Sequence, residues 1–227
     1  VIDIGNSSVK LYLFENNFIL FNEIFKEDEL LDKLQFIDQK HDVSNVICSS
    51  VTNNYEKDLH NIFKKSIIYD LSDENLKFPF KNNYQSKNTL GQDRLSLISS
   101  VVNEYSNQNS LIIDIGTCIT YDFVDLNNVY HGGAISLGIA ARYQSFNDYT
   151  SNLPLIEFKE IDKLVGANTN DSLHIGVSNG IIGEIKEYIR SLKTKYRDLN
   201  VIITGGDFSF LLNKIKNAIF ADQDFLA

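Results

Sequence analysis

Two similar stretches of sequence, Val1–Lys10 ("VIDIGNSSVK") and Leu111–Thr120 ("LIIDIGTCIT"), decide the fold predicted for this chain. Each is an apolar, β-branched run that reaches an aspartate, continues through Ile, Gly and small polar residues, and then resumes an apolar alternation. A short strand, a glycine turn and a second strand predict a β-hairpin. Because the pattern occurs once in each half of the chain, the sequence indicates a duplication.

Strands and helices are predicted to alternate in both halves. Short β-branched or aromatic runs bounded by polar turns predict strands, and apolar residues at helical spacing predict helices. In the first half the predicted strands are Val1–Ile4, Lys10–Phe14, Phe18–Ile24, Asn45–Ser49 and Ile67–Tyr69, and the predicted helices are Glu27–Gln39, Tyr55–Lys65 and Gln92–Tyr105. In the second half the predicted strands are Leu111–Ile115, Ile119–Asp125, Val129–Ile135 and Val201–Thr204, and the predicted helices are Ile139–Tyr149, Asn168–Val177, Gly180–Tyr196 and Phe208–Ile219. This alternation favours an α/β fold, with mixed sheets flanked by helices, in two domains at residues 1–106 and 107–227.

The composition argues against several classes of protein. The chain has 227 residues, 43% of them hydrophobic, and a formal net charge of −9 without a basic run, so we expect no nucleic-acid partner. No apolar stretch is long enough to span a membrane and no signal peptide is visible, so we expect no membrane association and a cytoplasmic location. Cys48 and Cys118 lie in apolar, strand-like segments, which predicts buried, reduced thiols. Because the sequence lacks Met and begins inside a predicted strand, we expect residues to be missing before Val1.

Asp3 and Asp114 occupy equivalent positions at the ends of the two buried strands. A single Asp-Ile-Gly is typical of ordinary turns, which both Asp and Gly suit, but two equivalent copies indicate a shared use. A buried carboxylate is unfavourable unless it is paired or binds a cation, and the N–H groups of a glycine turn can hold an anion. A nucleotide phosphate held between two glycine hairpins, with a metal ion on a carboxylate, accounts for these residues. Further hydroxyl and amide donors follow the glycines, at Asn6, Ser7, Ser8 and Thr117.

At the level of fold, this arrangement resembles the superfamily of acetate kinase, sugar kinases, Hsp70 and actin. The resemblance implies duplicated ribonuclease H-like (actin-like ATPase) domains. The sequence "TGG" at Thr204–Gly206 fits it, because a late glycine pair in that superfamily approaches the adenosine part of the nucleotide. By itself the glycine pair is equally typical of an ordinary turn between a strand and a helix.

A narrower resemblance rests on Tyr84–Arg94, "YQSKNTLGQDR", in which Gly follows Tyr by seven residues and Asp-Arg opens a predicted helix. This spacing resembles the type III pantothenate kinase family, and the similarity covers essentially the whole chain. The chain departs from the family at Lys87 and Leu137, two positions where proline is common in the family. The loss of these prolines affects loop rigidity more than chemistry. The other segments that resemble the family are "DIGNSSVKL", "IIDIGTCITYD", "GGAISLGIAARYQSF" and "GANTNDSLHIGVSNGIIGEI".

The resemblance implies a role for each matched residue. The residues expected along the ATP phosphates are Asp3, Ile4, Gly5, Asn6, Ser7, Ser8, Val9 and Lys10, with Thr117 also touching ATP. The residues expected around pantothenate are Tyr84, Gly91, Gln92, Asp93 and Arg94, joined by Thr169 from a neighbouring subunit. Asp93 is the implied proton acceptor, Asp3 is expected to face Mg²⁺, and Asp114 is expected to bind K⁺ or NH₄⁺.

The chemistry of phosphoryl transfer supports these roles independently. The reaction needs positioning, charge neutralisation and one residue that accepts the hydroxyl proton. Asp93 suits the last task, because the positive end of a helix dipole should keep it ionised. Three converging carboxylates, Asp3, Asp93 and Asp114, would repel each other and ATP without cations. Arg94 could pair with the substrate carboxylate or brace Asp93, and the sequence does not decide between these roles.

The function predicted from the resemblance is ATP-dependent phosphorylation of pantothenate to 4′-phosphopantothenate, the first step of coenzyme A synthesis. One alternative is a nucleotide-binding transcriptional regulator of the same family with weak catalysis. Another is a kinase of a different small alcohol on the same fold, which fold alone does not exclude.

A homodimer with a shared active site is also expected. Apolar residues exceed what the predicted helices of the second half need, which is typical of a face that meets a partner. The four histidines have no metal-ligand spacing and are interpreted as surface or packing residues. Glu184 and Glu187 are interpreted as solvated charges. The apolar residues behind the dimer prediction are Ile139, Tyr143, Phe146 and Tyr149 on one helix, and Ile181, Ile182 and Ile185 on another.

Overall fold

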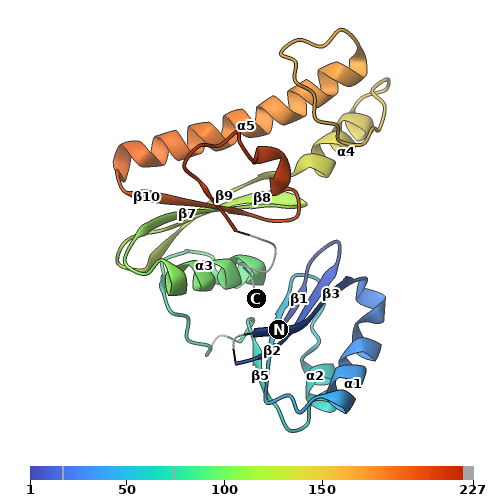
Figure 1. The fold of residues 1–227 in the computed structure, drawn as a ribbon, viewed down its shortest axis with the longest axis vertical. Helices are drawn as coiled ribbons and strands as arrows, with labels where there is room; N and C mark the ends of the chain where they lie inside the picture. Colours follow the sequence, from blue (N-terminus) through green and yellow to red (C-terminus); the bar gives the residue numbers. More distant parts are fainter. Residues whose placement is uncertain (17, 74, 222–227) are drawn as a thin grey trace. The chain divides into compact units, whose positions relative to one another are not determined.

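The computed structural model describes residues 1–16, 18–73 and 75–221, which form two compact units that each contain a β-sheet (Figure 1). The first unit comprises Val1–Pro79 and Gln85–Ser100. The second comprises Phe80–Tyr84 and the described residues from Val101 onward. Helix α3 (Gln92–Glu104) therefore begins in the first unit, and its last residues belong to the second.

The sheet of the first unit has the strand order β3-β2-β1-β4-β5. Its strands are β1 (Ile2–Ile4), β2 (Val9–Glu15), β3 (Phe18–Phe25), β4 (Asn45–Ser50) and β5 (Ile67–Asp70). The first three strands form an antiparallel meander, whereas β4 and β5 run parallel to β1. The short 3-10 helix η1 (Glu27–Glu29) and helix α1 (Leu30–Lys40) connect β3 to β4, and helix α2 (Glu56–Ile62) connects β4 to β5. Helix α1 forms where the sequence puts Leu30, Leu34 and Ile37 on one stripe, which is buried against the sheet.

The sheet of the second unit has the order β11-β10-β7-β8-β9-β6. Its strands are β6 (Lys81–Asn82), β7 (Asn109–Ile115), β8 (Cys118–Val124), β9 (Val129–Leu137), β10 (Leu199–Thr204) and β11 (Ile219–Phe220). Strands β7, β8 and β9 form an antiparallel meander, and β10 and β11 run parallel to β7. The second unit also contains α4 (Ile139–Tyr149), α5 (Thr169–Lys195) and η3 (Phe208–Leu211), whereas η2 (Lys87–Thr89) belongs to the first unit.

The strand orders confirm the predicted duplication. The order β3-β2-β1-β4-β5 in the first unit matches β9-β8-β7-β10-β11 in the second, with the same antiparallel and parallel pairs. Asp3 and Asp114 consequently occupy the same place, near the end of the central strand of each sheet. The predicted α/β class with mixed sheets is therefore confirmed.

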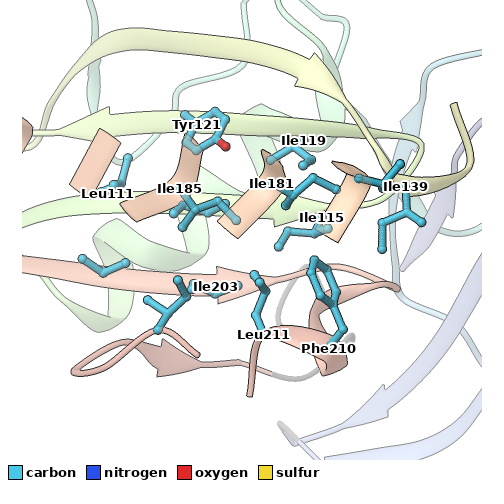
Figure 2. Packing of buried hydrophobic residues seen from close by; sticks show 14 of the residues in the cluster. Leu111, Ile115, Ile119, Tyr121, Ile139, Ile181, Ile185, Ile203, Phe210 and Leu211 are labelled. Atoms are coloured by element: carbon cyan, nitrogen blue, oxygen red, sulfur yellow. The ribbon is translucent and has the colours of Figure 1, made fainter. Parts of the chain in front are cut away.

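The core of the second unit lies between its sheet and helix α5. Figure 2 shows Ile181 and Ile185 of α5 projecting toward the strand residues Leu111, Ile115 and Ile119. All five side chains are fully buried. Because burying an aliphatic side chain of this size contributes about 1.5–3 kcal/mol, this stripe fixes α5 on the sheet and with it the residues that the helix carries.

Helix α5 corrects one sequence prediction. Two helices, Asn168–Val177 and Gly180–Tyr196, were expected on either side of "SNG", but the structure has one helix over Thr169–Lys195. Glycine in a helix interior costs about 1 kcal/mol relative to alanine. Burial of Val177, Ile181 and Ile185 on the same face of the helix outweighs that cost.

The end of the described chain corrects a second prediction. A helix was expected over Phe208–Ile219, but the structure has only the 3-10 helix η3 followed by turns and strand β11. Asn213 and Asn217 adopt positive φ values of 72° and 58°, which no right-handed helix contains. Asparagine tolerates this conformation better than other residues, so the two asparagines explain why the apolar pattern does not continue as a helix.

The two cysteines differ from each other. Cys48 on β4 is buried as predicted, and burial raises the pKa of its thiol to about 12. Cys118, predicted to be buried, is exposed at the start of β8, next to the turn between β7 and β8. Among the residues that the model describes, no helix combines the length and the apolar character needed to cross a membrane.

The continuity of α5 can be tested at Gly183, where an added Cβ would meet no atom within 4 Å. We expect Gly183→Ala to raise the free energy of unfolding by about 0.5–1 kcal/mol, measured by urea or thermal denaturation, because alanine is the better helix former. As a control, Gly205→Ala should be destabilising, since Gly205 has a φ of 103°. Destabilisation by Gly183→Ala would contradict a continuous helix at this point.

Candidate active site

The turn between β1 and β2 carries the first set of predicted site residues. Asp3 on β1 lies opposite Lys10 on β2 and beside Ser49 on β4 in the strand register. The Gly5 N–H donates to the Ser8 carbonyl at 3.0 Å, which closes a tight turn. Ile4 and Val9 on either side of the turn are buried, so the hydrophobic core fixes its two ends. Asn6 and Ser7 are exposed at its tip.

Asp3 lies in an electrostatic environment that disfavours its charge. Burial raises the pKa of Asp3, the nearby Lys10 ammonium lowers it, the Asp93 carboxylate raises it and the Ser49 hydroxyl lowers it. The net pKa lies above the ordinary value for aspartate. Within the first unit, Asp3 and Asp93 therefore lie close enough for their charges to interact.

The start of helix α3 carries Asp93. The Asp93 Oδ1 atom accepts a hydrogen bond from the Arg94 N–H at 2.8 Å, so the carboxylate folds back over the first turn of the helix. An added Cβ at Gly91 would lie 2.3 Å from the same oxygen, so a larger residue there would require the Asp93 carboxylate to move. The Gln92 Oε1 atom accepts from the Ser50 N–H at 2.8 Å and ties this helix start to the end of β4. The Arg94 side chain is buried.

In the second unit, Asp114 lies against the glycine pair that follows β10. Asp114 on β7 is flanked by Thr120 on β8 and Thr204 on β10 in the register. Gly205 has a φ of 103°, and an added Cβ would lie 2.4 Å from Asp114 Oδ1 and 2.3 Å from the Ile115 carbonyl oxygen. The Asp207 N–H also donates to the Ile115 carbonyl at 3.0 Å. The Thr204–Gly206 turn and the carboxylate are thus one local structure, a contact that the sequence did not predict.

The turn between β7 and β8 is supported by a second glycine from elsewhere in the chain. The Gly138 N–H, between β9 and α4, donates to the Thr117 carbonyl at 3.0 Å. An added Cβ at Gly138 would lie 1.9 Å from the Gly116 carbonyl oxygen. Only a glycine allows this approach, so the start of α4 rests directly on the predicted nucleotide turn.

Tyr84 is oriented by three residues of the second sheet. Its ring stacks on Tyr130, with 5.9 Å between ring centroids, and the Tyr130 hydroxyl donates to Asp122 Oδ1 at 2.6 Å. Gly132 has a φ of 94°, and an added Cβ would lie 3.0 Å from Tyr84 Cδ2. Asp122 is fully buried. The ring of Tyr84 therefore lies between Tyr130 and a position where only glycine leaves room.

Thr169 is the first residue of α5 and is exposed. The helix is capped by Asn168, whose Oδ1 atom accepts from the Asp171 N–H at 2.9 Å. The Lys163 ammonium contacts Asp171 at 3.0 Å and pins the preceding loop to the helix start. The sequence "GANTND" therefore forms a rigid helix start that presents the Thr169 side chain to the surface.

Pairs of adjacent glycines in the sequence are the signal that could have indicated two close contacts of the site, at Gly132 and at Gly205, that were not predicted. Gly132 lies in "HGG" and Gly205 in "TGG", and glycine pairs near strands indicate close backbone approach. The partner in each contact, Tyr84 for Gly132 and Asp114 for Gly205, is distant in sequence and could not be read from the pattern. Glu184, which the sequence indicates to be a solvated charge, instead forms an ion pair with Arg142 at 2.7 Å.

The histidines behave as the sequence indicated, as surface or packing residues. His131 contacts Asp125 at 2.8 Å on the exposed side of β9, and His174 is buried against the Tyr143 hydroxyl at 2.7 Å. Within residues 1–16, 18–73 and 75–221, no three His, Cys, Asp or Glu side chains gather to hold a metal ion. Mg²⁺ in phosphoryl-transfer sites needs only one or two carboxylates plus phosphate oxygens and water, and Asp3 fits that requirement.

Comparison with known proteins assigns the family. The family model described as type III pantothenate kinase matches residues 1–191. The chain belongs to the type III pantothenate kinase family. A type III pantothenate kinase from Christiangramia forsetii is 42% identical over 227 residues, covering 100% of this chain and 93% of its own length. Another from Flavobacterium psychrophilum is 40% identical over 225 residues, covering 99% of this chain and 93% of its own length.

Solved structures show the same fold. A protein from Campylobacter jejuni described as a Baf family transcriptional activator has a TM-score of 0.64 at 24% identity, covering 97% of this chain and 89% of that one. A protein from Sinorhizobium meliloti described as a 2-dehydro-3-deoxygalactonokinase has a TM-score of 0.63 at 8% identity, covering 99% and 94%. At these identities the likeness concerns the fold alone.

The raised pKa of Asp3 predicts a pH-dependent stability. A carboxyl whose pKa is raised in the folded state binds its proton more tightly there, so it destabilises the fold increasingly as pH rises from its unfolded pKa to its folded pKa. Asp3→Asn should therefore unfold at a higher temperature than the wild type at pH 7 without metal, with a smaller difference near pH 4. The exposed Asp162→Asn should show no such trend; a constant difference across pH would contradict the environment described for Asp3.

Proposed function

We propose that this chain transfers the γ-phosphoryl group of ATP to pantothenate and forms 4′-phosphopantothenate, the first step of coenzyme A synthesis. The observation that carries the proposal is the pairing, within one unit, of the Asp3 turn with the Asp93 carboxylate at a helix start. Asp3 is suited to bind a cation that also contacts the phosphates, and Asp93 is suited to accept the proton of a hydroxyl group. Membership of the type III pantothenate kinase family supports pantothenate as the acceptor.

The turn from Asp3 to Lys10 binds the ATP phosphates in this proposal. The Gly5–Ser8 hydrogen bond closes a tight turn with the exposed residues Asn6 and Ser7 at its tip. Backbone N–H groups in such a turn can bind an anion. Lys10 provides a cation opposite Asp3 in the register. Asp3 would hold Mg²⁺, which supplies charge neutralisation for the phosphates when it is bound. Thr117 would contact ATP from the equivalent turn of the second unit.

Asp93 accepts the proton of the attacking hydroxyl. The hydrogen bond from the Arg94 N–H and the helix start favour its ionised form, and Gly91 leaves space for the carboxylate to fold back. The residues that this proposal assigns to pantothenate binding are Tyr84, Gly91, Gln92, Asp93, Arg94 and, from the neighbouring subunit, Thr169. The Tyr84 ring is held between Tyr130, on which it stacks, and Gly132, so it can offer the substrate a fixed surface.

Asp114 holds the monovalent cation in this proposal. Its carboxylate lies beside the Gly205 backbone, close to the Ile115 carbonyl, so oxygen atoms are available around one point. K⁺ is a large monovalent cation that loses its hydration water at little cost, so protein oxygen atoms can replace that water. NH₄⁺ can donate hydrogen bonds to the same oxygens. A cation there would offset the repulsion between the carboxylate and the phosphates.

The protein acts as a homodimer in the cytoplasm in this proposal, and Thr169 completes the pocket of the neighbouring subunit. Large apolar side chains close to α4 and to the start of α5 support a partner surface. Tyr149 is 88% exposed, Leu164 86% and Val165 82%. Exposure of such large apolar side chains is unfavourable in a monomer and is relieved by association.

Removal of the proposed proton acceptor gives the central test. Asp93→Asn keeps the size and the hydrogen-bond acceptor of the side chain but not its basicity, so turnover of pantothenate should fall by about 10²–10⁴-fold. Binding of ATP, followed with a fluorescent analogue, should stay within about twofold because Asp93 lies at the acceptor side. The assay couples ADP release to pantothenate and, in parallel, to other small alcohols. Near-normal turnover in the variant would show that Asp93 is not the proton acceptor. Faster turnover of another alcohol by the wild type would show that pantothenate is not the preferred substrate.

The monovalent cation can be tested by salt exchange. At equal ionic strength, activity should be high in KCl or NH₄Cl and low in NaCl, because Na⁺ binds water more tightly and fits a different cavity size. Asp114→Asn should be nearly insensitive to the choice of salt. Equal wild-type rates in all three salts would contradict a cation site at Asp114.

Subunit sharing predicts complementation between two inactive variants. Thr169→Val and Asp93→Asn should each be weakly active alone, but a heterodimer of the two contains one site with both native residues. After unfolding and refolding together, roughly a quarter of the sites should be intact, since half of the dimers are mixed and one of their two sites is native. Sedimentation gives the oligomeric state. A fully active monomer, or a dimer in which mixing restores nothing, would contradict the shared site.

A further inference from the structure

A polar cluster joins helix α5 to the junction of β9 and α4. The Glu184 carboxylate on α5 accepts hydrogen bonds from the Tyr121 hydroxyl at 2.7 Å, the Arg142 Nη2 atom at 2.7 Å and the Ser136 hydroxyl at 3.1 Å. Arg142 Nη2 also contacts Ser136 Oγ at 3.0 Å. Three residues, from β8, β9 and α4, thus converge on the carboxylate that α5 carries, and none of the four was among the predicted site residues.

The cluster is partly withdrawn from water. The Arg142 and Glu184 side chains are 19% and 32% exposed, and Tyr121 is fully buried. Burial acts to raise the pKa of Glu184, but the hydrogen bonds from Tyr121 and Arg142 outweigh it, and the net pKa is lowered. Burial and the bond to Glu184 raise the pKa of Tyr121. Charge-assisted bonds in such surroundings hold side chains in one geometry more firmly than exposed pairs do.

Arg142 transmits this geometry to the nucleotide turn. Its Nε atom donates to the Leu137 carbonyl at 2.8 Å, and its backbone N–H donates to the Gly138 carbonyl at 3.1 Å. The Gly138 N–H in turn donates to the Thr117 carbonyl at 3.0 Å, with the Gly138 backbone in contact with Gly116. The segment Leu137–Gly138 is held by Arg142 on one side and by the turn on the other.

We infer that Arg142 and Glu184 are positioning residues for the nucleotide turn at Gly116–Thr117: they fix Leu137–Gly138 against that turn and so hold Thr117 in place for ATP. This rests on the proposed function in one respect, the contact between Thr117 and ATP. The Gly138 backbone packs directly on the turn, since an added Cβ there would lie 1.9 Å from the Gly116 carbonyl oxygen. Loss of the pair removes the fixed position of the Arg142 side chain and with it the hydrogen bond to the Leu137 carbonyl, and a shift of even about 1 Å at a binding turn weakens positioning substantially.

The chain offers a matched control on the same helix. Arg190 and Glu187 form a two-point ion pair, with N···O distances of 2.8 and 2.7 Å, chemically like the pair of Arg142 and Glu184. Their side chains are 72% and 57% exposed, and both lie on α5. Glu187→Gln therefore removes the same charge from the same helix without touching the segment Leu137–Gly138.

The experiment measures ATP and pantothenate separately in Glu184→Gln, Arg142→Lys and Glu187→Gln. We expect Glu184→Gln to raise the KM for ATP and the Kd of a fluorescent ATP analogue by roughly tenfold, while the KM for pantothenate changes less than about twofold. Arg142→Lys retains a charge beside Glu184 but loses the Nε–H that holds the Leu137 carbonyl, so it should weaken ATP binding as well. Glu187→Gln should leave all three quantities unchanged.

A double-mutant cycle with Thr117→Val separates positioning from general destabilisation. If the pair acts through the turn, Glu184→Gln should weaken binding of the analogue much less in the Thr117→Val background than in the wild type. Equal effects in both backgrounds, or unchanged affinity for the analogue in folded Glu184→Gln and Arg142→Lys proteins, would overturn the inference. A parallel loss of ATP and pantothenate binding in these variants would also overturn it.

The outcome separates this inference from the proposed function. Binding of the analogue is measured without turnover, so it reports on the turn even if pantothenate is not the acceptor. Wild-type protein that binds the analogue but does not phosphorylate pantothenate would refute the proposed function alone. Wild-type protein that phosphorylates pantothenate, with variants of unchanged ATP affinity, would refute the inference alone.

Discussion

The position of Asp3 at the end of a central buried strand is the constraint on which the proposed site depends. Burial and the nearby Asp93 carboxylate both disfavour its charge, and Lys10 and Ser49 offset this only in part, so that the pKa of Asp3 stays raised. A site that carries such an unfavourable charge in the free protein gains affinity for a cation with bound phosphate, because the ligand supplies the missing compensation. The duplication places Asp114 at the equivalent point of the second sheet, where the Gly205 backbone lies beside the carboxylate.

Glycines give these turns their shape by allowing backbone to approach backbone or side chains at distances that a Cβ would block. Gly138 meets the turn at Gly116, Gly205 meets Asp114, and Gly132 meets the ring of Tyr84. Each contact joins segments far apart in the sequence. Tight packing of this kind transmits small shifts, since no soft side chain lies between the partners. Residues that hold Gly138 in place can therefore influence the turn at Gly116 without touching a ligand.

Helix α5 connects packing and polar structure in the second unit. Its apolar stripe, with Ile181 and Ile185, is fixed on the sheet (Figure 2), and Glu184 on the same helix receives hydrogen bonds from β8, β9 and α4. The energy of apolar burial holds the helix, and the directional bonds of Glu184 set where the segment before α4 lies. A single uninterrupted helix is needed for both, which explains why three glycines are accommodated within it.

The sequence by itself determined the duplicated hairpins, the mixed α/β class, most elements and the family, because these follow from local alternation and from motifs such as "GQDR" that are contiguous. It also predicted that the carboxylates of Asp3 and Asp93 converge, and the Asp93 carboxylate is one of the groups that raise the pKa of Asp3. Tertiary structure alone decided that α5 continues through "SNG", that Asn213 and Asn217 end the apolar pattern after η3, and that Glu184 is an ion-pair partner and not a solvated charge. In each case the deciding energy comes from burial, backbone conformation or a partner distant in the chain, and none of these is encoded in a local window of sequence.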